Sequence, residues 1–332
     1  MKRMAVIGMV MLGVCTALAF ILFTLRSSST AYYRGRSADA WLGDMGKTNQ
    51  AAVLMAFKVM GTNALPALVR ALEAKDKSGP MARFYGREYQ KLPHFIRWRL
   101  AEPISAEQSQ NAAELLFLKS GNARMVLPDL LRIMEHGDEH PASFAGGMAA
   151  ALVNPNDTNA IPILERCLTN TNYVVRRSAA VGLGRIGSGA ETAVPTLTNA
   201  LQDPMVDVRI CAAYALWKVD GETNMATSVL KKAMENASRG GSATQRWSAI
   251  VLSEVNPGEL SALPVLLGYF DDRDYSLARE AVSAVGRYGP AATSAVPALT
   301  YKIDTGDRDM RERALESLKR IDPAEAAKYE GK

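Results

Sequence analysis

Few residues of this chain have the types and spacing that catalysis or ligand binding requires. Residues 182–187 read Gly-Leu-Gly-Arg-Ile-Gly, a glycine spacing typical of loops that hold a dinucleotide pyrophosphate at a helix N-terminus. Such a site needs the glycines between a strand and a following helix. Here the surrounding pattern places them at the end of a helix, so we expect a helix stop and no cofactor.

Histidine and cysteine are too sparse to suggest a reactive centre. His136 and His140 stand four residues apart with acidic residues between them, a spacing that on a helix could share a metal ion. Gly137 favours a loop instead, and we expect no metal site. Cys167 and Cys211 lie in separate apolar segments and are expected to be buried thiols. We therefore predict no catalytic residues, no cofactor and no metal, although a triad assembled in space need not show in the sequence.

Composition sets the broad class. The 332 residues are 48% hydrophobic and 22% charged, which is enough apolar material for a packed core and excludes wholesale disorder. Lys and Arg number 39 against 34 Asp and Glu, a net charge of +5. This balance is weaker than the basic footprint of most nucleic-acid-binding proteins. Three cysteines are too few for a disulfide scaffold.

The N-terminal region predicts a membrane anchor. Residues 4–25 carry no charge, and as a helix they would span about 33 Å, which matches a hydrocarbon core of about 30 Å. A signal peptide cleaved after residues 17–19 is an alternative. A lipoprotein modified at Cys15 is another, but it lacks the small residue that should precede the cysteine. We expect an uncleaved anchor, followed by a linker over residues 26–50.

The orientation of this anchor is nearly balanced by charge, because basic residues flank both of its ends. Translocating the short cationic tail of residues 1–3 has no obvious driver. We therefore expect that tail in the cytoplasm, a single pass through the inner membrane, and an exported, periplasmic body.

A five-residue phrase, small–aliphatic–Pro–x–Leu, recurs along the rest of the chain. Its prolines are Pro66, Pro128, Pro162, Pro195, Pro264 and Pro297. They are separated by 33 or 34 residues, or by about twice that. Proline is tolerated in the first turn of a helix, where its missing N–H would have no partner. Each phrase therefore predicts the start of a helix, and a second helix fits between it and the next phrase.

The third unit shows the pattern most clearly, with predicted helices over 160–169 and 173–186. We expect seven such pairs after a leading helix at about 51–61, and a non-repetitive tail over 322–332. One pair cannot bury its apolar face alone, so the pairs must stack on one another. The phrase, the period and the small-residue second helix resemble HEAT repeats over residues 51–321, in the short bacterial variety also found in phycobilisome-lyase-like proteins. This resemblance implies an all-α, right-handed α-α superhelix.

An insertion over residues 76–107 interrupts the first pair. It mixes basic and aromatic side chains, among them Arg83, Arg87, Arg97, Trp98 and Arg99. Three interpretations stay open: aromatic packing against the first repeats, a membrane or protein contact, and single-stranded nucleic-acid binding.

Two charged columns keep step with the period. Arg176, Arg209 and Arg311 share one repeat position, with Asp207 and Asp309 two residues before the latter pair. The HEAT resemblance implies that these residues form an inter-repeat ladder. Gln245 and Ala278 interrupt that column, and Arg246 and Arg279 could substitute from the next position. The second column is Arg185, Lys218, Glu254, Arg287 and Arg320, at the C-terminal ends of the second helices, where cations offset the helix dipole. A basic stripe that faces a ligand is the alternative interpretation of this column.

The resemblance is specific for fold and poor for function, because HEAT arrays serve as scaffolds, adaptors, transport receptors and occasionally lyases. We expect a membrane-tethered scaffold without catalysis that binds a protein partner on its concave, second-helix face. The residues expected to contact the partner are Arg177, Tyr214, Trp247 and Arg287. The alternatives are a phycobilin-lyase-like enzyme and a nucleic-acid-binding repeat protein.

Overall fold

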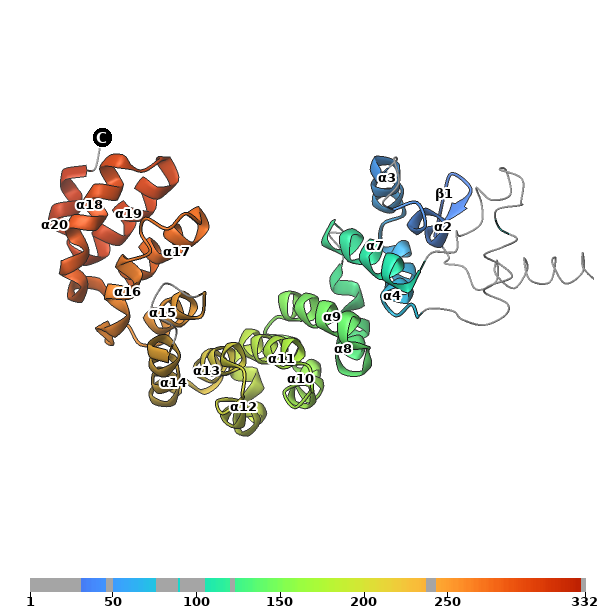
Figure 1. Ribbon diagram of the computed structural model, residues 1–332, viewed down its shortest axis with the longest axis horizontal. Helices are drawn as coiled ribbons and strands as arrows, with labels where there is room; N and C mark the ends of the chain where they lie inside the picture. Colours follow the sequence, from blue (N-terminus) through green and yellow to red (C-terminus); the bar gives the residue numbers. More distant parts are fainter. Residues whose placement is uncertain are drawn as a thin grey trace, which may run out of the picture. The chain divides into compact units, whose positions relative to one another are not determined.

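The computed structural model describes residues 31–45, 50–75, 89, 105–119, 123–236 and 243–329. The chain divides into two compact units, Met1–Met148 (unit 1) and Ala149–Lys332 (unit 2). Nearly every described element is a helix (Figure 1). The predicted anchor over 4–25 lies outside the described residues. So do Arg83, Arg87, Arg97, Trp98 and Arg99 of the insertion.

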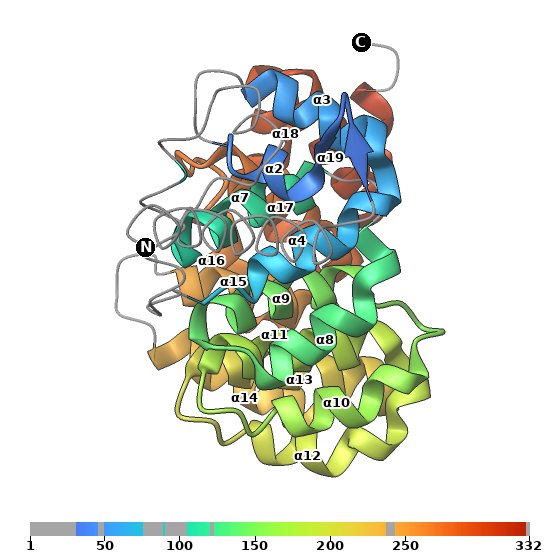
Figure 2. The ribbon, with the colours of Figure 1, turned by 90° about the vertical axis from the view of Figure 1, so that its right-hand side faces the viewer.

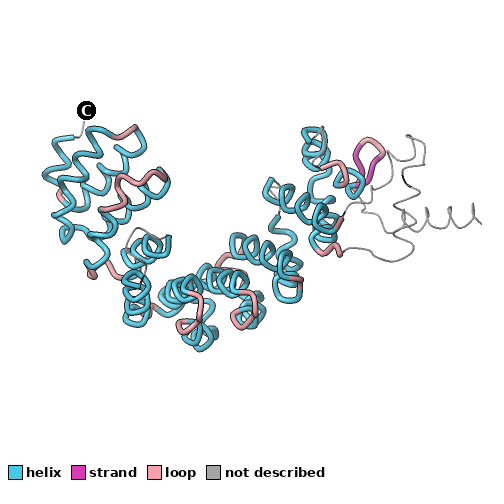
Figure 3. The backbone as a smooth tube through the Cα atoms, viewed as in Figure 1, coloured by secondary structure: helices cyan, strands magenta, loops and turns pink. Residues whose placement is uncertain are grey.

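Unit 1 opens with a small hairpin that no pattern in the sequence indicates (Figure 3). Strands β1 (Tyr32–Tyr33) and β2 (Arg36–Ser37) pair in antiparallel fashion. The turn between them has positive φ at Arg34 (50°) and Gly35 (74°), the backbone of a two-residue hairpin turn. The expected all-α fold did not include this hairpin, because two-residue strands are too short to show an alternating pattern.

The remaining elements of unit 1 are helical, and they include the first predicted pair. They are α2 (Ala38–Leu42), α3 (Gln50–Met60), η1 (Gly61–Ala64), α4 (Leu65–Leu72), α7 (Ala106–Lys119), η2 (Ala123–Val126) and α8 (Leu127–His136). Helix α9 (Glu139–Leu152) begins in unit 1 and ends in unit 2. Helices α4 and α7 contact each other across the insertion, as expected for the two halves of an interrupted pair. Tyr89, within the insertion, is buried.

One helical segment of the described residues, Gln50–Leu72, has the length and apolar composition that could cross a membrane. It is not one straight helix, because Gly61 has a positive φ (56°) and a 3₁₀ turn separates α3 from α4. Helix α4 buries Leu65, Leu68 and Leu72 in the core of unit 1. The apolar composition of this half of the segment is therefore that of a core helix.

Unit 2 continues the alternation of first helices, called A, and second helices, called B. The A helices are α10 (Ile161–Cys167), α12 (Val194–Ala200), α14 (Thr223–Asn236), α16 (Leu263–Leu267) and α18 (Val296–Thr305). The B helices are α11 (Tyr173–Ile186), α13 (Val206–Asp220), α15 (Ala243–Val255), α17 (Tyr275–Val285) and α19 (Arg308–Ile321). The 3₁₀ turns are η3 (Thr158–Ala160), η4 (Gly187–Ala193), η5 (Leu260–Ala262) and η6 (Gly286–Ala295). With α4/α7 and α8/α9, the described residues contain the seven predicted pairs.

The local sequence explains where these helices begin. In six A helices the proline of the recurring phrase occupies the first turn, after a 3₁₀ turn that ends in a small or β-branched residue. Side chains of Asn172, Asp274 and Asp307 accept backbone N–H bonds and so cap α11, α17 and α19. Helix α11 has the bounds predicted for it, and α10 is shorter at both ends. The predicted tail instead begins with a further short helix, α20 (Pro323–Ala326), and a 3₁₀ turn, η7 (Ala327–Tyr329).

The B helices of unit 2 pack directly on one another, with α11 against α13, α13 against α15, α15 against α17 and α17 against α19. The A helices α10 and α12 lie on one side of α11 and α13 in both views (Figures 1 and 2). Glycine permits the close approach. A Cβ on Gly184 would lie 3.1 Å from the Cα of Ala215, and one on Gly286 would lie 2.9 Å from the Cα of Ser317. This packing forms a continuous layer whose outward face is the B-helix surface.

Candidate functional site

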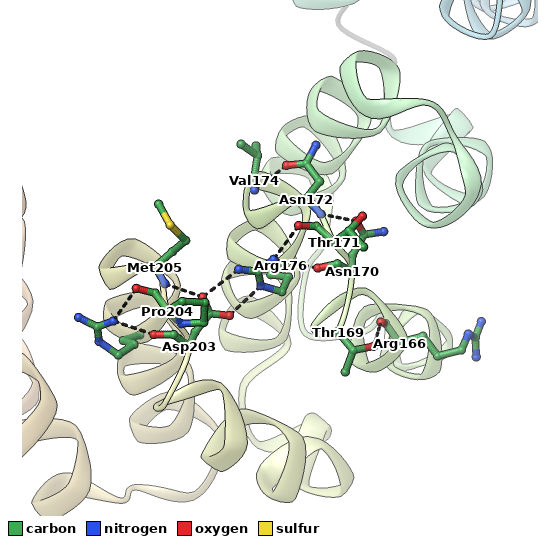
Figure 4. A network of polar contacts seen from close by, with 11 residues as sticks. Arg166, Thr169, Asn170, Thr171, Asn172, Val174, Arg176, Asp203, Pro204 and Met205 are labelled. Atoms are coloured by element: carbon green, nitrogen blue, oxygen red, sulfur yellow. Dashed lines mark hydrogen bonds and ion pairs between the residues drawn. The ribbon is translucent and has the colours of Figure 1, made fainter.

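The loops that join A to B helices hold an arginine–carboxylate network, which we call the loop edge. Its clearest part centres on Arg176 in the second turn of α11 (Figure 4). The guanidinium donates from Nε and Nη2 to the two carboxylate oxygens of Asp203, at 2.7 and 2.9 Å. Its Nη1 donates to the carbonyls of Asn170 and Thr171, at 2.8 and 3.0 Å. Arg176 thereby ties its own loop to the loop of the next repeat.

Among the described residues, the next repeat has the contacts to loop carbonyls but not the contact to a carboxylate. Arg209 in α13 donates to the carbonyls of Asp203 and Pro204, at 2.7 and 3.1 Å. Asp207, which was expected in the ladder, lies in the first turn of α13. The acid that pairs with Arg176 is instead Asp203, in the loop before that helix.

Farther along, arginines from the neighbouring column take over, as the interruption by Gln245 and Ala278 suggested. Arg246 pairs with Asp272 at 3.2 Å, and Arg279 pairs with Asp309 at 2.6 Å. Asp309 therefore links two repeats, although with Arg279 and not with Arg311. Arg311 itself donates to the carbonyl of Ile303 at 2.9 Å, within its own repeat.

The sequence did contain a signal for the acid that was missed. Asn170, Asp203 and Asp272 each accept the backbone N–H of the second residue after them, at 2.8 Å in all three cases. They are 33 and 69 residues apart, the same spacings as the recurring prolines. Thr305 stands at the next equivalent position and has no carboxylate, which explains why Asp309 serves the last step of the ladder.

The charges of the loop edge depend on these contacts. Burial alone would raise the pKa of Asp203, but hydrogen bonds from Arg176 and from the N–H of Met205 outweigh it and lower the pKa. The hydrogen bond to Asp203 raises the pKa of Arg176. The side chains are only 12% and 7% exposed, so both groups stay charged in a fixed, paired geometry.

A second cluster lies on the B-helix surface, around Glu254 of α15. The hydroxyl of Tyr214 donates to Glu254 Oε1 at 2.9 Å, and Lys218 Nζ lies 3.2 Å from the same oxygen. Burial, and then the hydrogen bond to Glu254, raise the pKa of Tyr214, so the hydroxyl remains protonated. The ammonium of Lys218 also lies 4.3 Å from the ring centroid of Trp217.

The next B helix reaches the same carboxylate. Arg287, which follows α17, donates to Ser253 Oγ at 3.0 Å and lies 3.9 Å from Glu254 Oε2. Glu254 is therefore contacted from the repeats on both sides of its own. We call Tyr214, Trp217, Lys218, Glu254 and Arg287 the Glu254 cluster.

The four residues predicted to contact a partner fall into two groups. Tyr214 and Arg287 are brought together in the Glu254 cluster. Arg177 on α11 is exposed, and Trp247 on α15 is 47% exposed. Trp247 lies two helical turns before Glu254 and so shares its face of α15. From the sequence, Lys218 and Glu254 belong to a column that indicates helix ends or a basic ligand-facing stripe, whereas their joint cluster depends on contacts between repeats.

The glycines, cysteines and histidine that the sequence offers for chemistry lie outside these two networks. Residues 182–187 end α11, where Gly187 has a φ of 69°, as the sequence predicts. Cys167 and Cys211 are buried, and burial raises the pKa of the Cys211 thiol to about 12. His140 lies 3.5 Å from Glu114. Within the part of the chain that the structure describes, no group of three or more potential ligands could hold a metal ion.

Stacked pairs of helices with a continuous B-helix layer define an α-solenoid of helical repeats. The model of the HEAT repeat family matches residues 127–217 and, overlapping them, residues 162–253. These matches take in the helices from α8 to α15. Residues 127–253 therefore carry HEAT repeats.

Solved structures give similarities at low identity. The complex of CpcE and CpcF of phycocyanin lyase from Nostoc sp. PCC7120 is 17% identical, with 85% of this chain and 93% of that chain covered and a TM-score of 0.46. An engineered protein from the Northeast Structural Genomics Consortium is 19% identical over 61% of this chain and 97% of that one, with a TM-score of 0.38. A designed armadillo repeat protein in complex with the peptide (KR)4 is 15% identical over 86% and 99%, with a TM-score of 0.29. No curated protein matches the chain.

Proposed function

We propose that the chain is a membrane-anchored scaffold that binds a protein partner through the B-helix surface of unit 2 and performs no catalysis itself. HEAT repeats provide extended surfaces for this purpose. The anchor is the uncharged segment 4–25, with residues 1–3 in the cytoplasm and the repeats on the periplasmic side of the inner membrane.

The observation that carries the partner-binding proposal is the Glu254 cluster beside Trp247. Contacts to Glu254 hold an aromatic and two cationic side chains, from the repeats on both sides of its own, in one arrangement. Side chains that are ordered before binding lose less conformational entropy when a partner docks. Tryptophan, tyrosine and arginine are also the residues that most often dominate binding energy.

Photo-crosslinking tests this proposal in intact membranes. A photoreactive amino acid replaces Trp247 in the full-length protein, and the matched control carries it at Tyr301, which is 58% exposed on the A helix α18. We expect one stoichiometric protein adduct from position 247 and none from position 301. Trp247→Ala should weaken the isolated complex by about 2 kcal/mol or more, roughly 30-fold, and Tyr301→Ala should leave it unchanged. Equal adducts from both positions would exclude the B-helix surface as the binding site.

The topology has its own test. Protease added outside intact spheroplasts should digest the repeats and leave a short membrane fragment. Full protection of the repeats would place them in the cytoplasm and reverse the proposed orientation.

A further inference from the structure

Helix α3 is apolar on two sides. Its inward side buries Val53, Ala56, Phe57 and Met60 in unit 1. Its outward side carries Ala51, Met55 and Val59, which follow one another at the four-residue spacing of a single helical stripe. Met55 is 52% exposed and Val59 is 56% exposed. A surface helix ordinarily carries charged or polar residues there, so this stripe is unusual.

Helix α3 and the hairpin that contacts it also carry exposed aromatic and basic side chains. Helix α3 contacts strand β1, whose Tyr32 is 54% exposed. Arg34 in the hairpin turn and Lys58 on α3 are exposed as well. Exposed apolar, tyrosine and basic side chains together are the composition of surfaces that lie in a membrane interface, with cations near anionic headgroups.

The covalent structure of the chain limits how far this surface can be from a bilayer. Only six peptide units separate Leu25, the last residue of the uncharged segment, from Ala31, which is buried at the start of unit 1. Six extended residues reach about 20 Å at most. The polar headgroup layer itself takes about 5–8 Å of that length on each side of the hydrocarbon core. Strand β1, and α3 in contact with it, are therefore held next to the headgroups whenever residues 4–25 span the membrane.

We propose that α3 lies against the lipid surface and inserts the stripe of Ala51, Met55 and Val59 among the headgroups of the bilayer that residues 4–25 span. This inference rests on the proposed membrane anchoring. It assigns unit 1 a second membrane contact, which fixes how the first repeats leave the bilayer. A lipid surface fits better than a protein partner, because the short connection supplies the lipid at high effective concentration.

Site-directed spin labelling of the full-length protein tests this contact. The protein is reconstituted in vesicles of phosphatidylethanolamine and phosphatidylglycerol, with Cys15→Ala as background, since Cys167 and Cys211 are buried. Labels are attached in Met55→Cys and Val59→Cys. The control is Leu115→Cys, at a position 47% exposed on α7 of the same unit. Collision rates are measured with oxygen, which concentrates in lipid, and with a water-soluble nickel chelate.

The labels at positions 55 and 59 are expected to collide several-fold more with oxygen than with the chelate, and the label at position 115 is expected to show the reverse. Flotation of the vesicles after an alkaline wash reports the anchor separately. Protein that floats while positions 55 and 59 are as open to the chelate as position 115 overturns the contact and leaves the anchor intact. Equal protection at all three positions also overturns it, because the effect would not belong to α3. Protein that fails to float removes the anchor and the inference together.

Discussion

The ladder at the loop edge predicts a specific cost for losing Arg176. The substitution Arg176→Ala removes two charge-assisted bonds to Asp203 and two bonds to the carbonyls of Asn170 and Thr171. Asp203 would keep the N–H of Met205 but would lose the guanidinium that pairs with its carboxylate, with its side chain 7% exposed. Exposed ion pairs contribute about 0–1 kcal/mol, and removal of one partner from a fully buried pair costs about 3–5 kcal/mol. The pair of Arg176 and Asp203 lies near the surface but is shielded from solvent, so we expect its loss to cost an intermediate amount, about 2–4 kcal/mol.

Native-state hydrogen exchange, resolved by peptide mass spectrometry, is the suitable assay, because repeat arrays open locally and not as one cooperative unit. Amides of α11 and α13 should exchange about 30- to 700-fold faster in Arg176→Ala, the factor that 2–4 kcal/mol implies. Arg176→Lys keeps the charge without the bidentate geometry and should give an intermediate change. The matched control is Arg308→Ala, because Arg308 is 92% exposed in its pair with Glu312. The ladder has no structural role if Arg176→Ala changes exchange in α11 and α13 as little as this control.

Two further predictions concern pH and packing. Because Arg176 holds the pKa of Asp203 below its ordinary value of about 3.9, the pair stabilises α11 and α13 above that pH and loses the contribution as the pH falls through the lowered pKa. Asp203→Asn should flatten the acid dependence of helix exchange, and an unchanged acid profile would identify another group. Gly286→Ala should destabilise unit 2 by about 1–3 kcal/mol, since its Cβ would lie 2.7 Å from the hydroxyl of Ser317. Gly147→Ala, where a Cβ meets nothing within 4 Å in the middle of α9, should stabilise by about 0.5–1 kcal/mol. Guanidinium denaturation followed by circular dichroism checks both, and changes of the same sign would contradict the packing argument.

Local signals made the repeats predictable from the sequence. A proline in the first turn acts through its own ring and its missing N–H, so its effect does not depend on distant residues. The bounds of α11 follow from Asn172 at one end and Gly187 at the other. The hairpin of Tyr32–Ser37 was missed because it depends on a two-residue turn and on packing around Arg36. The guanidinium of Arg36 lies over the ring of Trp41, at 4.4 Å from its centroid.

The ladder was only partly predictable, for a geometric reason. Comparing columns of the repeat aligns helix with helix, and so Asp207 was matched to the arginines of the B helices. The carboxylate that pairs with Arg176 belongs to Asp203 in the loop. It accepts the backbone N–H of Met205, which closes a local turn, and it also faces the previous repeat. Which acid reaches the guanidinium depends on how far one repeat is displaced along the next. The regular spacing of the loop acids does indicate which acid pairs with the arginine. This signal can be used only when the loop positions, and not just the helix positions, are compared between repeats.

The loop edge and the Glu254 cluster are expected to serve different purposes, the first the stability of the repeats and the second partner binding. At the loop edge, guanidinium groups such as that of Arg176 are already hydrogen-bonded to carboxylates and carbonyls of the protein itself. A partner would have to break those bonds before it could bind the guanidinium groups. On the B-helix surface, Trp247 is left 47% exposed beside a cluster whose members are held by Glu254. A change at the loop edge should therefore alter helix opening before it alters partner capture, whereas Trp247→Ala should weaken capture with no change in the exchange of α11 and α13. If one variant changed both quantities in proportion, binding would depend on the folding of the repeats as a whole and not on a particular face.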